Sequence, residues 1–298
     1  MKKTYVEFKQ YVAEHIKESL SEEYQDYDIK EQHILNSRGE YDALMVTSTD
    51  KGMNIAPALN LTQAYESYGN GKSLDEVIEE LADIRMNATI PTFDKNDLFK
   101  WETVKDRVFP RLINTEFNEE YLKDKPRVDM ADLSIVFAVR ISEDERGFAD
   151  AVITKDLSDM WGIDVDTIRE QAIANLTNAQ ALFVNIEKML FGMVDTNIDF
   201  DGEMAPFYVL TNKQKTKGAS MVFNKTLMNE VVDRLGEVYI IPSSVDELLV
   251  VPQSECDDIN RLRDMVLQVN ESEVRPEDKL SDNIYSYDRE TNSLVCVS

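Results

Sequence analysis

Hydrophobic residues recur every three or four positions in several segments of the chain, and this spacing is typical of an amphipathic helix. The clearest case begins after Ser73, which has Glu76 three residues later, as in a capping box. The hydrophobic positions that follow predict a helix from Leu74 to Ile84. A further predicted helix opens at Pro57, a position where the missing N–H of proline is not needed. The pattern predicts the remaining helices over residues 4–19, 57–68, 97–108, 165–175, 178–191, 224–235 and 255–270.

Other segments are continuously hydrophobic or rich in β-branched and aromatic residues, and these predict strands. Residues 133–141 are typical of a buried strand, and the polar connection after them predicts pairing with residues 149–154. Residues 27–36 and 41–49 predict a hairpin that turns at Gly39. Further strands are predicted over residues 207–211, 219–223, 238–241, 247–251, 284–287 and 294–297, the last two as a hairpin.

The order of these elements predicts an α+β protein with two subdomains. A chain of 298 residues lies near the size at which a single hydrophobic core stops growing. Prolines interrupt the pattern before residue 131, and the pattern becomes more regular from Asp132. We therefore expect an N-terminal α+β subdomain over residues 1–131, built as helix, hairpin and helix. Residues 132–298 are expected to form a mixed β-sheet covered by three or four helices.

The chain is strongly acidic, with 57 acidic and 32 basic residues and a formal net charge of −25. Nucleic-acid affinity depends on lysine and arginine side chains that displace counterions, so direct binding to DNA or RNA is not expected. The most basic local segment, residues 212–218, is interpreted as a solvated hairpin loop, with phosphate contact as the alternative.

Two cysteines and two histidines occur in the chain: Cys256, Cys296, His15 and His33. Two cysteines so far apart form neither a disulfide framework nor the paired spacing of a zinc site. The N-terminal segment lacks the apolar run of a signal peptide, and no stretch of about 20 apolar residues occurs. We therefore expect a cytoplasmic protein that does not span a membrane.

The acidic segment that contains Asp195, Asn197, Asp199 and Asp201 is the one metal-like string in the sequence. Its alternating oxygen side chains resemble the start of a calcium-binding loop. Counted from Asp195 or from Asn197, however, the position of the closing glutamate holds a proline or a tyrosine. These four residues are therefore weak candidates for calcium, and a solvated acidic turn is the favoured interpretation.

No arrangement of residues predicts a catalytic site or a bound organic cofactor. The serine pair 243–244 lies between two predicted strands without a G-x-S-x-G elbow, so its hydroxyl groups are expected to bond turn backbone. His15 and His33 are expected to pack or to lie on the surface. Trp101 and Trp161 are expected to pack in the core, with a ligand groove as the alternative. Glycine-rich phosphate-binding motifs do not occur.

Four short segments carry a resemblance to a known family: NIAPALNL at 54–61, AYESY at 64–68, FPRLIN at 109–114 and GEVYIIPSS at 236–244. Together they resemble an uncharacterised bacterial family, a domain of unknown function of gut anaerobes and mobile elements that is distantly similar to the YtpQ family. The resemblance spans most of the chain and implies an intact cytoplasmic domain. It implies no activity, so no catalytic residue follows from it.

These observations predict a non-enzymatic protein-interaction module with an unidentified protein partner. One alternative follows from the charge and is an acidic DNA mimic that inhibits a DNA-acting enzyme. A further alternative is a hydrolase or metal-dependent enzyme whose carboxylate site the sequence does not reveal. The sequence leaves the oligomeric state open.

Overall fold

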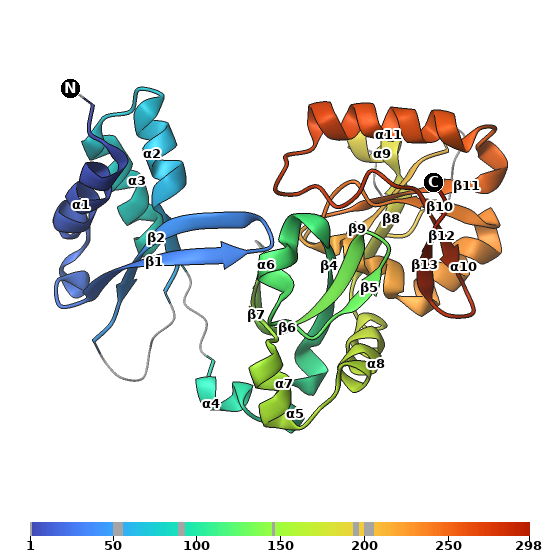
Figure 1. The fold of residues 1–298 in the computed structure, drawn as a ribbon, viewed down its shortest axis with the longest axis horizontal. Helices are drawn as coiled ribbons and strands as arrows, with labels where there is room; N and C mark the ends of the chain where they lie inside the picture. The colour runs from blue at the N-terminus through green and yellow to red at the C-terminus, as the bar shows by residue number, and fades with distance from the viewer. Residues whose placement is uncertain (1, 50–55, 89–92, 145–146, 193–196, 200–205) are drawn as a thin grey trace. The chain divides into compact units, whose positions relative to one another are not determined.

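The computed structural model describes residues 2–49, 56–88, 93–144, 147–192, 197–199 and 206–298 (Figure 1). The chain divides into two compact units, residues 1–92 and residues 93–298, which we call unit 1 and unit 2. The subdomain boundary expected after residue 131 lies within unit 2, between two strands that pair with each other.

In its described residues, unit 1 combines a three-stranded antiparallel sheet, in the order β1–β2–β3, with three α-helices (Figure 1). Its elements are α1 (Tyr5–His15), β1 (Asp28–Asn36), β2 (Gly39–Thr47), β3 (Ala58–Asn60), α2 (Leu61–Gly69) and α3 (Leu74–Met86). The predicted order of helix, hairpin and helix is therefore confirmed. Phe8, Val12, Leu44 and Leu81 belong to one buried cluster, so both the helices and the hairpin contribute to the core of this unit.

Side-chain caps determine where two helices of unit 1 begin. Ser73 Oγ accepts a hydrogen bond from the amide three residues later at 3.2 Å, which confirms the predicted capping box. The helix predicted to open at Pro57 begins instead at Leu61. Its cap is Asn60, whose Oδ1 accepts from the Gln63 amide at 2.9 Å, and β3 takes the preceding residues.

Unit 2 begins with a four-stranded antiparallel sheet built on the long strand β6. Its strands are β4 (Val108–Asn114), β5 (Val128–Met130), β6 (Leu133–Asp144) and β7 (Gly147–Val152). The predicted pairing of β6 with β7 is confirmed. Strand β4 was not predicted, because Pro110 argued against a strand there. As β4 lies at the edge of the sheet, the missing N–H of Pro110 leaves the hydrogen-bond ladder intact.

A second, six-stranded sheet of unit 2 has the order β13–β12–β10–β11–β9–β8, and its neighbouring strands pair antiparallel. Its strands are β8 (Ala181–Asn185), β9 (Tyr208–Asn212), β10 (Val238–Ile241), β11 (Leu248–Pro252), β12 (Tyr285–Asp288) and β13 (Ser293–Cys296). All but β8 agree with predicted strands. The predicted C-terminal hairpin is formed by β12 and β13.

The alternation of side chains along the second sheet gives it two covered faces. Ile240 and Val250 belong to the large core cluster together with Met228 of α10, whereas Ile241 belongs to a second cluster with Leu262 of α11. The helices of unit 2 are α4 (Lys95–Leu98), α5 (Trp101–Val104), α6 (Glu119–Leu122), α7 (Lys155–Trp161), α8 (Val165–Leu176), α9 (Ile186–Leu190), α10 (Lys225–Leu235) and α11 (Ile259–Glu273). The α+β class predicted from the sequence is confirmed, but in place of the expected mixed sheet the described strands of unit 2 form two antiparallel sheets.

Two predicted elements of unit 2 are wrong. The segment 178–191 was predicted as one helix but forms β8 followed by the short helix α9. The segment 219–223 was predicted as a strand but belongs to the 3₁₀ helix η5 (Gly218–Phe223), all of whose residues are buried. A short apolar run that is buried on all sides has no polar face, so its periodicity does not separate strand from helix.

None of the helices in the described part of the chain is both long and apolar enough to cross a membrane.

Arg85 on α3 is a charged side chain that lies buried in unit 1, with 1% of its surface exposed. Its Nε donates to the Val46 carbonyl at 2.9 Å. Its guanidinium carbon lies 4.6 Å from the ring centre of Tyr24 and 5.5 Å from that of Tyr27. The two rings offer negative faces to the buried cation. Arg85 therefore joins α3 to β2 and to the segment that precedes β1.

Replacing Arg85 by alanine is expected to destabilise unit 1 by about 3 kcal/mol, since it leaves a cavity and an unpaired carbonyl. Hydrogen exchange of the α3 amides measures this free energy locally. The control is Arg38→Ala, at an exposed position in the β1–β2 turn, which is expected to change stability by less than about 0.5 kcal/mol. Equal protection of α3 in both variants would contradict the stabilising role of Arg85.

Candidate functional site

The calcium candidates lie only in part within the described residues. Asp195 and Asp201 fall outside them. Asp199 accepts a hydrogen bond from Lys188 Nζ at 2.8 Å, and its amide donates to the Phe183 carbonyl at 2.7 Å. Asn197 lies beside the same strand, with its carbonyl oxygen 2.8 Å from the amide of Phe183. Among the described residues, no three acidic, histidine or cysteine side chains are grouped as a metal site would need.

The turn-stabilising role expected for the serine pair is confirmed for Ser244, and both tryptophans pack against the hydrophobic core. Ser244 Oγ accepts from the Asp246 amide at 3.0 Å, which is the turn-stabilising role predicted for it. The rings of Trp101 and Trp161 pack at 5.4 Å, and Trp161 Nε1 donates to the Leu98 carbonyl at 2.9 Å. None of these side chains lines the cavity described below.

His15 and His33 both lie in unit 1 and differ in their surroundings. His15 stacks on Tyr11 with ring centres 4.0 Å apart, and its Nδ1 lies 2.8 Å from the Tyr11 carbonyl oxygen. His33 instead lies between two carboxylates, with Nδ1 3.0 Å from Asp42 Oδ1 and Nε2 3.3 Å from Glu40 Oε2. The hydrogen bond to Asp42 is the main cause that raises the pKa of His33, and Glu40 adds to it.

Asp42 is the common acceptor of a cluster on the β1–β2 hairpin. It accepts from Lys9 Nζ at 2.8 Å and from the Tyr5 hydroxyl at 3.0 Å, in addition to His33. Lys9, then His33 and Tyr5, lower the pKa of Asp42 well below its usual range. All of the Asp42 contacts stabilise its ionised form, so this cluster leaves little capacity for a ligand and is structural.

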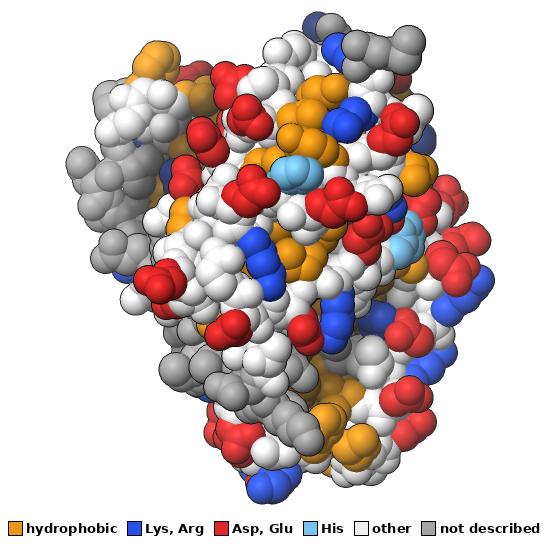
Figure 2. All heavy atoms as spheres, turned by 90° about the vertical axis from the view of Figure 1, so that its left-hand side faces the viewer, with side chains coloured by type: hydrophobic (Ala, Val, Ile, Leu, Met, Phe, Trp, Pro, Cys, Tyr) orange, Lys and Arg blue, Asp and Glu red, His pale blue; other side chains and the backbone are white. Residues whose placement is uncertain are grey.

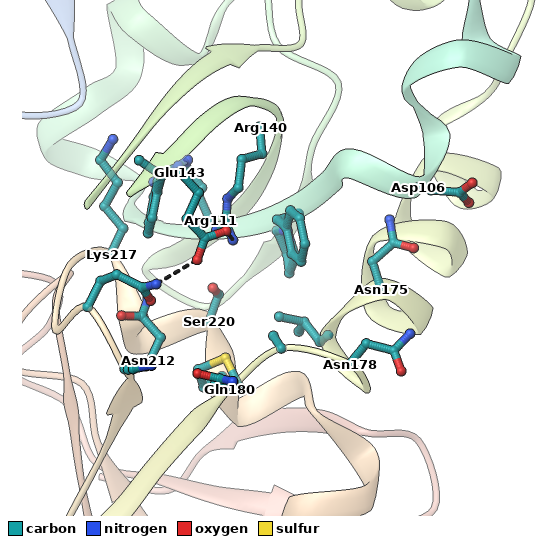
Figure 3. A pocket seen from close by; sticks show the side chains of 18 residues that line it. Asp106, Arg111, Arg140, Glu143, Asn175, Asn178, Gln180, Asn212, Lys217 and Ser220 are labelled. Carbon is teal, nitrogen blue, oxygen red and sulfur yellow. Dashed lines mark hydrogen bonds and ion pairs between the residues drawn. The ribbon is translucent and has the colours of Figure 1, made fainter. Parts of the chain in front are cut away.

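A cavity with a volume of about 910 Å³ lies in unit 2 (Figure 3). It is lined by the sheet built on β6, by the end of α8 and the loop before β8, and by the residues that follow β9. Its polar lining consists of Asp106, Arg111, Arg140, Glu143, Asn175, Asn178, Gln180, Asn212, Lys213, Gln214, Lys217 and Ser220. Four of these side chains are cationic and two are carboxylates, the reverse of the balance in the whole chain.

Strand register brings the arginines to the same face of the β6 sheet. Phe109 and Arg111 of β4 pair with Ala138 and Val136 of β6. Paired residues of antiparallel strands point to the same side, and side chains alternate along each strand. Phe109 and Arg111 therefore share a face with Arg140, which lies two residues beyond Ala138.

A β-bulge in β6 adds Glu143 to this face. Arg140 pairs with Asp150, but Ser142 pairs with Ala149, so β6 has one extra residue between them. In a regular strand, residues three positions apart point to opposite sides. The extra residue therefore places Glu143 on the same side as Arg140, and Glu143 Oε2 lies 2.9 Å from Arg140 Nη1.

Two aromatic rings hold the Arg140 guanidinium in place. Its carbon atom lies 4.2 Å from the ring centre of Phe109 and 4.1 Å from that of Phe148. The side chain of Arg140 is 19% exposed. Stacked aromatic faces stabilise a guanidinium without using its N–H donors. The donors therefore remain in position for hydrogen bonds in the cavity.

Asp150 links two further cations of the same end of the cavity. It forms a buried ion pair with Arg111, and Lys217 Nζ lies 3.3 Å from its Oδ2. In Figure 3, Arg111, Arg140 and Lys217 gather at one end of the cavity, whereas Asn178 lies at the other. The cationic end is therefore built from three separate elements: β4, β6 and the turn after β9.

A tight turn positions Lys217. Lys217 has a left-handed backbone with φ of 51°, and its amide donates to Asp246 Oδ1 at 2.6 Å. The next residue, Gly218, donates to the Asp246 carbonyl at 3.0 Å. A Cβ atom on Gly218 would lie 2.1 Å from Thr211 Oγ1 and 2.7 Å from the Asn212 amide nitrogen. Only glycine fits this close approach of two backbone segments.

Three neutral polar side chains of the lining have no hydrogen-bond partner among the described residues: Asn178, Gln180 and Ser220. Ser220 on η5 is 5% exposed, and its hydroxyl points into the cavity (Figure 3). This hydroxyl has no partner among the described residues and is therefore available to a bound molecule. The lining therefore offers fixed cations at one end and neutral donors and acceptors along its length.

The sequence indicated only one part of this site. The lysine-rich segment 212–218 was interpreted as a solvated loop with phosphate contact as the alternative, and Lys213 and Lys217 do line the cavity. Arg111 belongs to the FPRLIN segment but was given no role. The sequence did not indicate that Arg140 and Glu143 are in contact, because this contact depends on the bulge in β6.

A protein-family model described as "Family of unknown function (DUF5688)" matches residues 5–289. No curated protein and no solved structure matches the chain. The match covers nearly the whole chain and carries no assigned activity.

The pKa of His33 is expected above 6.5 in the folded protein and is expected to fall in Asp42→Asn. A raised pKa stabilises unit 1 fully below 6.5, and this contribution is lost as the pH rises through the folded value. Histidine NMR titration measures the shift. Glu40→Gln is the matched control and is expected to lower the pKa by less, since Glu40 is the secondary cause. A larger effect of Glu40→Gln would contradict this assignment.

Gly218→Ala is expected to destabilise unit 2 by about 2 kcal/mol or more, because the new Cβ overlaps two atoms of the facing segment. Differential scanning calorimetry of the full chain measures the effect as a lower unfolding temperature. The control is Gly69→Ala at the end of α2, where a Cβ meets nothing within 4 Å. Unfolding of Gly218→Ala at the wild-type temperature would show that the turn tolerates a side chain.

Proposed function

The chain belongs to DUF5688, a family of unknown function, and we propose that unit 2 binds a small anionic ligand in its cavity. The ligand carries a carboxylate or a phosphate, the groups that guanidinium forks recognise. A volume of about 910 Å³ is in the range of sites for small molecules and cofactors.

One observation carries this proposal: the Arg140 guanidinium is held between Phe109 and Phe148 at the wall of the cavity. A preorganised donor loses little conformational entropy when it binds an anion. Arg111 and Lys217 add positive charge at the same end. In a chain of net charge −25, such a local excess of cations favours an anion that would be repelled elsewhere.

The proposed role is binding without catalysis. The described lining holds no histidine and no cysteine, and its cations Arg111, Arg140 and Lys217 are held by carboxylates or aromatic rings. A hydrolase would instead need a nucleophile beside a general base. Ser220 is the one hydroxyl of the lining, and no described base is bonded to it.

A protein-interaction role, expected from the sequence, is the second candidate. The adjacent side chains Leu190 and Phe191 after β8 are 76% and 67% exposed, and large exposed apolar side chains favour protein contacts. The DNA-mimic alternative finds less support. On the face in Figure 2, acidic side chains are interspersed with basic and hydrophobic ones and form no continuous stripe.

The proposal predicts that acetate or inorganic phosphate, titrated at low ionic strength, shifts the Arg140 Nε–Hε NMR signal in a saturable way. Arg140→Gln is expected to weaken binding at least about tenfold, as followed by calorimetry, because it removes a charge-assisted hydrogen bond. The control Arg234→Gln removes an exposed arginine that pairs with Glu230 on α10. If neither anion shifts the Arg140 signal, or if both variants bind equally, the cavity is not an anion site.

A further inference from the structure

We propose that the anion bound in this cavity is a carboxylate, and that Glu143 occupies its place in the ligand-free protein. This inference rests on the proposed function. Glu143 Oε2 accepts from Arg140 Nη1 at 2.9 Å, and its Oε1 accepts from Gln214 Nε2 at 2.5 Å. The carboxylate thus bridges β6 and the loop after β9.

The bridge shows which head group the cavity accepts. Two donors from different elements converge on the two oxygens of a single carboxylate. Such convergence is the geometry that carboxylate recognition needs. The donors are kept in place without Glu143: Phe109 and Phe148 hold Arg140, and the loop that carries Gln214 is closed by the Asn212 side chain, which donates to the Thr216 carbonyl at 2.7 Å.

Glu143 accepts a hydrogen bond from only some of the N–H donors of the Arg140 guanidinium. The Nε atom of Arg140 is buried and has no hydrogen-bond partner among the described residues. Glu143 is tied to the same strand three residues away and reaches Nη1. A free carboxylate has no such tether and can accept two parallel hydrogen bonds from the guanidinium. A ligand is therefore the better partner for this arginine.

Glu143 can leave the site at low cost, because its side chain is already 41% exposed. Its displaced carboxylate regains water, whereas Arg140 exchanges one carboxylate for another. A monovalent carboxylate thus keeps the charge of the cationic end unchanged. A phosphate, which carries between one and two negative charges near neutral pH, adds charge close to Asp150.

The test uses acetate and methylphosphonate, which share a methyl group and differ in the anionic head. Affinities for the full chain are measured from the Arg140 Nε–Hε signal at constant ionic strength. Glu143→Ala is expected to bind acetate about tenfold more tightly than the wild type, because no internal carboxylate competes. Glu230→Ala, which removes the acid of the exposed Glu230–Arg234 pair, is the matched control and is expected to bind as the wild type does.

Glu143→Asp distinguishes two effects of Glu143: filling of the ligand site by its carboxylate, and repulsion of the ligand by its charge. Aspartate keeps the negative charge but is too short to bridge Arg140 and Gln214. Tighter acetate binding in this variant supports the inference. Wild-type affinity in Glu143→Asp, with tighter binding only in Glu143→Ala, would show that Glu143 acts through its charge alone and would overturn the occupancy. Methylphosphonate binding more tightly than acetate to the wild type would overturn the carboxylate assignment.

The two proposals fail in different ways. If the wild type binds acetate and Glu143→Ala binds it no more tightly, this inference fails and the anion site stands. If no variant responds to either anion, both fail. Binding seen only in Glu143→Ala supports the occupancy by Glu143 but shows that the wild-type cavity does not bind these anions, so the proposed function fails. Backbone amide spectra that match the wild type confirm that each variant is folded.

Discussion

The register of β6 is the constraint on which the arrangement of unit 2 depends. This strand pairs with β4, β5 and β7, so its alternation decides which side chains of the whole sheet enter the core. Ile135, Phe137 and Val139 face the large hydrophobic cluster, whereas the residues between them face the opposite side. The extra residue in the bulge interrupts this alternation near the end of β6 and brings a carboxylate beside Arg140. The cavity is thus a consequence of how one strand is paired.

Local signals predicted much of the fold. Helix caps such as Ser73 and hydrophobic runs such as residues 133–141 act within a few positions, so the sequence shows them directly. The failures have a common physical cause. Residues 219–223 and the region of β8 are buried by segments distant in the chain, and such burial hides the polar face that periodicity needs. The sequence does not show how those segments meet.

The candidate site was harder to predict than the fold, because average charge conceals local charge. A net charge of −25 argued against direct binding of nucleic acid, yet four cations line one cavity. The contacts that define the site join distant positions, such as Glu143 with Gln214 and Arg111 with Asp150. Only the lysines of segment 212–218 stood out in the sequence, since they are close neighbours. A composition describes the surface as a whole, and a binding site depends on a small part of it.

The packing of Trp101 against Trp161 has a consequence for spectroscopy. These are the only two tryptophans of the chain, and both belong to unit 2, with ring centres 5.4 Å apart. Emission excited selectively at tryptophan therefore reports on unit 2 alone. Unit 1 contains tyrosines but no tryptophan, so its unfolding would leave that emission unchanged. A single fluorescence transition would measure the stability of one unit and would not establish that the two units unfold together.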